Sequence, residues 1–156
     1  MVLNVLNIIV LVTVVVSILA FTNNEISRKL LYIPYEVKNG NNYTRVFGHM
    51  FIHADYMHLG FNMYSLYILG TPVESAYGRN KFLTIFTISL LTGSLTSVFL
   101  NTSNFASVGA SGAIFGLFGA LAIVGKRIGA DIRSIVVIIG INFAFGFALG
   151  GVDWRA

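Results

Sequence analysis

The chain is poor in charge and has no cysteine, and each shortage excludes a class of protein. Only 10% of its 156 residues are charged, against roughly 25% in an ordinary soluble domain, so the chain is not a typical soluble protein. The lack of cysteine excludes disulfides and thiolate metal sites and leaves the redox compartment open. The net charge of +4 comes from too few basic residues, too thinly spread, to form a phosphate-binding stripe, so no nucleic-acid partner is expected.

What the chain does have is hydrophobic sequence, at 56% of its residues. Five apolar runs are candidates for membrane-spanning helices, each of which takes about 20 residues. They cover about residues 2–21, 57–76, 82–100, 111–124 and 132–150. The first has no basic residues before it and exceeds the apolar core of a signal peptide, about 7–15 residues, so it is read as a span. The fourth is short, which is acceptable where neighbouring helices surround its ends. The composition therefore predicts an all-α, polytopic membrane helix bundle in a single domain, residues 1–156.

The stretch between the first two spans, residues 22–56, is predicted to be an outer loop on the membrane surface. It contains Pro34 and the run Asn39-Gly40-Asn41-Asn42, which favour turns. Its isoleucine, leucine, tyrosine and phenylalanine residues favour contact with the bilayer interface.

The short loops carry the topology signal. Basic residues follow the second and fourth spans, and none lies between the third and fourth: Arg79, Lys81, Lys126, Arg127 and Arg133. Because cytoplasmic loops are enriched in lysine and arginine, these two loops are assigned to the cytoplasm. The amino terminus is then cytoplasmic and the loop of residues 22–56 is outside, although that loop also holds four more widely spaced basic residues. We expect an integral, multi-pass protein of the plasma membrane.

A serine stands between glycines where the fourth span begins, in Gly109-Ala110-Ser111-Gly112. Glycines on both sides let a backbone or a substrate come close to the hydroxyl of Ser111. The same pattern has a structural interpretation, because small residues spaced like Gly112 and Gly116 let membrane helices pack closely.

A second polar segment ends at His58 and Asn62, which are four positions apart and so share one face of a helix. Polar side chains inside a span are costly and usually face the bundle interior or a watery cavity. If Ser111 attacks a carbonyl, the side chains of His58 and Asn62 can donate to the oxyanion together with the Ser111 amide. As an alternative, His49, His53 and Asp55 have a spacing that suits zinc.

These segments together resemble the signature of rhomboid intramembrane serine proteases. The first block is matched by Arg45, His49, His53, His58 and Asn62, and the second by Gly109, Ser111 and Gly112. Gly70 and Glu74 extend the resemblance along the second span. It implies a six-helix core of which five spans are present, with Ser111 as nucleophile, His58 and Asn62 in the oxyanion hole, and Gly109 keeping the approach to the serine open. It implies no cofactor, and its substrates would be transmembrane proteins in the lipid bilayer.

The resemblance also assigns a general base that this sequence does not contain. The family places a histidine after a pattern like Asp-x-x-Ala, and the chain ends at Asp153-Trp154-Arg155-Ala156. We therefore expect a fragment of a longer protease that is inactive by itself. Of the remaining residues, His49 and His53 are expected to order the loop, Arg45 to bind loop carbonyls, and Glu74 to cap the inner end of the second span.

Three functional classes follow. The first is an intramembrane endopeptidase that cuts transmembrane helices near the outer leaflet through a Ser-His dyad. The second is a non-catalytic relative that binds such helices without cutting them. The third, a small transporter or channel, is disfavoured because no charged span or repeated half is present.

Overall fold

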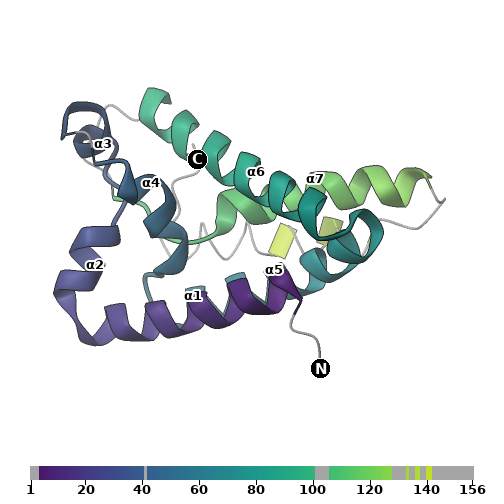
Figure 1. The fold of residues 1–156 in the computed structure, drawn as a ribbon, viewed down its shortest axis with the longest axis horizontal. Helices are drawn as coiled ribbons and strands as arrows, with labels where there is room; N and C mark the ends of the chain where they lie inside the picture. Colours follow the sequence, from purple (N-terminus) through teal and green to yellow (C-terminus); the bar gives the residue numbers. More distant parts are fainter. Residues whose placement is uncertain are drawn as a thin grey trace.

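The computed structural model describes residues 4–40, 42–100 and 106–127, together with positions 133, 136, 137, 140 and 141. Within these residues the chain is all-helical, apart from an isolated bridge between Tyr32 and Ser107. The elements, in chain order, are α1 (Val5–Thr22), α2 (Asn24–Leu30), α3 (Pro34–Gly40), α4 (Thr44–Gly48), the short 3-10 helix η1 (His49–Phe51), α5 (Tyr56–Tyr77), α6 (Arg79–Leu100) and α7 (Ser111–Arg127) (Figure 1).

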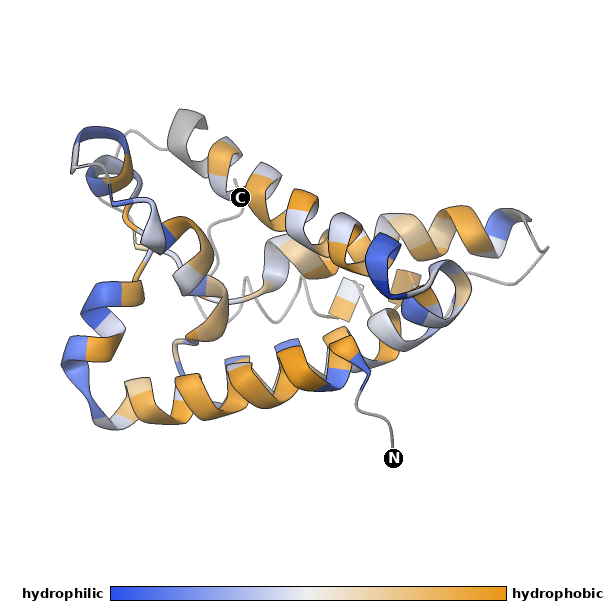
Figure 2. Cartoon of the chain, in the orientation of Figure 1, coloured by the Kyte–Doolittle hydropathy of each residue, from blue (hydrophilic) through white to orange (hydrophobic). Residues whose placement is uncertain are grey.

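Helices cover the first four predicted spans, and most of the predicted fifth, residues 132–150, lies outside the described residues. Helix α6 begins at Arg79 and α7 runs to Arg127, so both are longer than predicted. Among the described helices, α1 alone is both long and apolar enough to cross a membrane, and α7 is a shorter apolar helix. Figure 2 shows α1 almost uniformly hydrophobic, while hydrophilic residues gather on α2 and α3.

The prediction of a turn-rich loop for residues 22–56 is wrong, because most of this stretch forms short helices. Helix α2 begins after Asn23, whose side chain accepts a hydrogen bond from the Glu25 amide. Helix α3 begins at Pro34, where the missing N–H costs nothing. Turn-forming residues here start and stop helices.

The helices pack through small residues at two places. Helices α1 and α5 meet where Leu6 lies on Gly70; a Cβ there would lie 2.7 Å from a Leu6 methyl group. Helices α6 and α7 meet where Ser89 lies on Gly116; there a Cβ would overlap the serine side chain. The structural interpretation of the α7 glycines therefore holds at Gly116, and Gly112, next to Ser111, also packs on the backbone of α6, where a Cβ would lie 3.7 Å from Cα of Gly93.

Candidate active site

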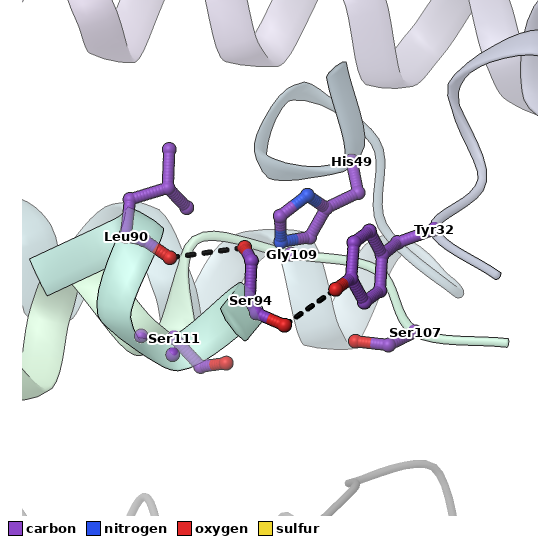
Figure 3. A pocket seen from close by; sticks show the side chains of 9 residues that line it. Tyr32, His49, Leu90, Ser94, Ser107, Gly109 and Ser111 are labelled. Atoms are coloured by element: carbon purple, nitrogen blue, oxygen red, sulfur yellow. Dashed lines mark hydrogen bonds between the residues drawn. The ribbon is translucent and has the colours of Figure 1, made fainter. Parts of the chain in front are cut away.

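Ser111 is the first residue of α7. The first amides of a helix lack intrahelical partners and form the positive end of its dipole, which favours a developing negative charge. The serine side chain is partly buried, and no described residue makes a hydrogen bond to its hydroxyl. It lines a small pocket whose other residues are Tyr32, His49, Leu90, Gly93, Ser94, Ser107, Gly109 and Gly112 (Figure 3).

Gly109 joins this segment to the histidines. Its φ of +104° lies in a region that side-chain-bearing residues rarely adopt. A Cβ at this position would also lie 3.0 Å from Cε1 and 3.1 Å from Nε2 of His58, and 3.6 Å from Cδ2 of His53. The Gly109 amide donates to the His49 carbonyl at 2.9 Å. Only glycine therefore satisfies both the backbone conformation and the close approach of the His58 ring.

His58 lies in the first turn of α5, which begins because the Asp55 side chain accepts the His58 amide at 2.8 Å. The Ala54 amide approaches Nδ1 of His58 at 3.4 Å, and Nδ1 can only accept there. In the neutral ring, Nε2 then carries the hydrogen and is a donor. The donor nitrogen is the one that faces Gly109, two residues before Ser111.

Asn62 lies one turn further along α5 and is 8% exposed. Its Nδ2 donates to the His58 carbonyl at 3.0 Å, which leaves the second hydrogen of this amide nitrogen free, and its Oδ1 has no partner. The structure thus brings His58 directly against the Gly109 segment and holds Asn62 on the same helix. Both side chains lie outside the pocket that Ser111 and His49 share.

Arg45 and His49 hold the segments around the pocket. The Arg45 guanidinium donates to the Leu31 carbonyl and forms an ion pair with Glu36 at 2.8 Å. Nδ1 of His49 lies 3.0 Å from the Arg45 carbonyl. The Arg45 side chain therefore ties α4 to α2 and α3, as a cation bound to a loop carbonyl.

Tyr32 is a residue of the pocket that the sequence analysis did not single out. It is fully buried, pairs with Ser107 through backbone hydrogen bonds, and donates its hydroxyl to the Ser94 carbonyl of α6. Its ring lies 5.0 Å from that of His49. No local pattern marks this tyrosine, because its partners come from segments far along the chain.

His49 and His53, which precede α5, are neutral near pH 7. Burial lowers the pKa of His49. Burial, with the neighbouring His58 as the second cause, lowers the pKa of His53 to about 3. Within the described residues no three histidine, aspartate or glutamate side chains are grouped as metal ligands, which speaks against the zinc alternative for His49, His53 and Asp55.

Glu74 lies far along α5 from the histidines, and its role differs from the prediction. Its two carboxylate oxygens accept the backbone amides of Val5 at 3.1 Å and Leu6 at 3.2 Å. It caps the amino end of α1, not the inner end of its own helix, because α1 and α5 lie side by side.

Comparison with known proteins gives the family. The Rhomboid domain model matches residues 40–156. The chain belongs to the rhomboid family. It is 42% identical to the rhomboid protease GluP of Bacillus subtilis over 110 residues, which are 65% of this chain and 21% of that protein. It is 37% identical to RHOMBOID-like protein 6, mitochondrial, of Arabidopsis thaliana over 119 residues, 71% of this chain and 38% of the relative.

A third relative is Rhomboid protein 1, mitochondrial, of Saccharomyces cerevisiae, 34% identical over 82 residues, 49% of this chain and 24% of the relative. The rhomboid chain thus aligns with well under half the length of these relatives. Family membership makes it an integral membrane protein of a family of intramembrane proteases.

Proposed function

We propose that this rhomboid protein is an intramembrane serine endopeptidase with Ser111 as its nucleophile. The observation that carries the proposal is the contact at Gly109, whose left-handed backbone lets the donor nitrogen of His58 lie beside the segment that leads to Ser111. If Ser111 were only a small residue that lets two helices pack closely, a histidine ring beside Gly109 would not be needed.

In the proposed reaction, the Ser111 oxygen bonds to the carbonyl carbon of a peptide bond and gives its proton to a base. The carbonyl oxygen becomes an oxyanion, which accepts hydrogen bonds from Nε2 of His58, Nδ2 of Asn62 and the Ser111 amide. The C–N bond then breaks, the leaving amine takes the proton from the base, and water hydrolyses the acyl-enzyme.

We propose that the base that accepts the Ser111 proton is none of the chain's three histidines. None of the three makes a hydrogen bond to the Ser111 hydroxyl, and Nε2 of His58 already carries a hydrogen. The resemblance assigns the base to a histidine that follows the Asp153-x-x-Ala156 pattern, so the 156-residue chain by itself is expected to turn over little substrate. The substrates are transmembrane protein helices cut near the outer leaflet, in a plasma membrane with the amino terminus cytoplasmic.

A serine-directed fluorophosphonate tests the nucleophile. The protein used is extended beyond Ala156 by the histidine and the sixth span that the resemblance implies, and is called the extended protein below. We expect labelling of the unsubstituted protein and none in Ser111→Ala. The matched control is Ser107→Ala, since Ser107 lines the same pocket and should leave labelling unchanged. Labelling that survives Ser111→Ala refutes the assignment, and an unlabelled, inactive extended protein favours the helix-binding alternative.

Comparing the 156-residue chain with the extended protein tests whether the base lies beyond Ala156. In detergent with a fluorescent transmembrane substrate it should show turnover lower by several orders of magnitude than the extended protein. Equal turnover would make His53 or His58 the base.

A further inference from the structure

Helix α1 lies outside the residues that the family model matches. It nevertheless contacts residues 51–53, which include His53, through the hydroxyl of Ser17. Ser17 is fully buried, at 0% exposed. Its Oγ donates to the Phe51 carbonyl at 2.9 Å and lies 3.0 Å from Nδ1 of His53. This is a contact between α1 and the residues that immediately precede α5.

The single hydroxyl hydrogen of Ser17 decides how His53 is protonated. Because the Phe51 carbonyl can only accept, that hydrogen is committed to it, and the bond between Ser17 and His53 must use a hydrogen from Nδ1. His53 is neutral, so its Nε2 then has no hydrogen. Ser17 thereby selects one tautomer of the ring as well as its orientation.

The ring that Ser17 holds lies against both proposed oxyanion donors. His53 packs edge-on against His58, with ring centroids 5.0 Å apart and planes at 71°. Asn62, Asp55 and His49 are further polar neighbours of the His53 ring, and Nε2 of His53 and Oδ1 of Asn62 are both buried without a hydrogen bond of normal geometry. Among the described side chains, Ser17 alone forms a hydrogen bond of normal geometry to the His53 ring.

We propose that Ser17 is a positioning residue for the oxyanion hole, which through His53 sets the places of the His58 and Asn62 side chains. The inference rests on the proposed function, since it assigns Ser17 to the same site. Without the Ser17 hydroxyl, both ring nitrogens of His53 are unpartnered in a buried setting, and the ring no longer has a fixed orientation to present to His58. A displacement of about 1 Å in a catalytic group can cost about 10²-fold in rate.

Helix α1 itself offers the matched control. Thr13 lies one turn before Ser17 on the same helix, is also 0% exposed, and has a hydroxyl without a partner. In the active, extended protein, Ser17→Ala should lower kcat about 10²-fold and leave KM within about threefold. Thr13→Val should leave kcat within about twofold. Ser17→Cys, which keeps a weak donor in nearly the same volume, should restore part of the rate and covers the case in which Ser17→Ala does not fold.

A second measurement does not depend on activity. The ¹⁵N imidazole spectrum of the protein, assigned with His53→Gln, should show His53 with its hydrogen on Nδ1, and Ser17→Ala should abolish this preference. A hydrogen on Nε2 in the unsubstituted protein, or a spectrum unchanged by Ser17→Ala, overturns the inference. Equal kcat in Ser17→Ala and Thr13→Val, with turnover still dependent on Ser111, also overturns it and leaves the proposed function intact. Absence of Ser111-dependent turnover instead overturns the proposed function itself.

Discussion

The two ends of α5 use their polar side chains differently. At the carboxyl end, both oxygens of Glu74 accept amides from the first turn of α1, where the helix dipole favours negative charge. At the amino end, Asn62 and His53 each keep a buried polar atom without a partner. Such an atom costs about 1–3 kcal/mol of stability. The carboxyl end is built for stability, whereas the amino end keeps unused hydrogen-bonding capacity where the histidines pack on Gly109, two residues before the proposed nucleophile.

The largest effect should come from removing a donor at the amino end. Oxyanion donors act on charge that develops only in the transition state, so Asn62→Ala in the extended protein should lower kcat about 10²–10³-fold with little change in melting temperature. His58→Ala should also slow turnover and, because His58 contacts Gly109, should lower stability as well. Turnover and thermal melting measured on the same preparations separate these effects. If both variants cleave as fast as the unsubstituted protein, the site drawn around Ser111 is wrong.

Two glycines sharpen the comparison further. Gly109→Ala and Gly78→Ala both force alanine into a positive φ, of +104° and +80°, at a cost of about 1–3 kcal/mol each. A Cβ at Gly78 meets nothing within 4 Å, whereas one at Gly109 meets the His58 ring. Both variants should therefore lose stability, but only Gly109→Ala should also lose turnover per folded molecule. Equal turnover in the two variants would remove the role given to the His58 contact.

At the carboxyl end, Glu74→Ala should lower the free energy of unfolding by about 1–2 kcal/mol, because two amides of α1 lose a charged acceptor. Ser75→Ala is the matched control, since Ser75 is the exposed neighbour and should change little. Unfolding in mixed micelles measures both. A Glu74→Ala variant as stable as Ser75→Ala would show that the cap does not hold α1.

The smallest effect should appear on mild acidification, over the single pH unit from 6.5 to 5.5. Folding keeps the pKa of His53 near 3, whereas the unfolded chain takes up a proton below about 6.5. Stability is therefore lost as the pH falls below 6.5, by at most about 1.4 kcal/mol per pH unit for this group, and the loss continues toward pH 3. Measured between pH 6.5 and 5.5, before carboxylates titrate, the slope should flatten in His53→Gln. An identical slope in that variant would assign the loss to other groups, among them His49, whose pKa burial also lowers.

Much of the helical arrangement follows from local sequence. Long apolar runs predict α1, α5 and α7, and the four-residue spacing of His58 and Asn62 predicts that they share one face of α5. The resemblance also marked Gly109, where the structure has a backbone that only glycine readily adopts. The short helices between residues 22 and 56 were missed, because caps such as Asn23 and Pro34 also signal turns.

The partners of Glu74 and Tyr32 could not be predicted, since the Val5 amide and the Ser94 carbonyl lie about 60–70 positions away along the chain. A backbone amide or carbonyl has no sequence signature of its own, so no pattern identifies it as a ligand.

The sequence by itself determined the membrane class, the helical periodicity and the residue types of the candidate site, because these depend on composition and on spacing within one element. Only the tertiary structure decided which elements meet: that α1 reaches His53 through Ser17, that the His58 ring lies on Gly109, and that Glu74 caps α1. The reason is that each of these contacts joins groups from different helices or segments, and their approach depends on how whole helices pack.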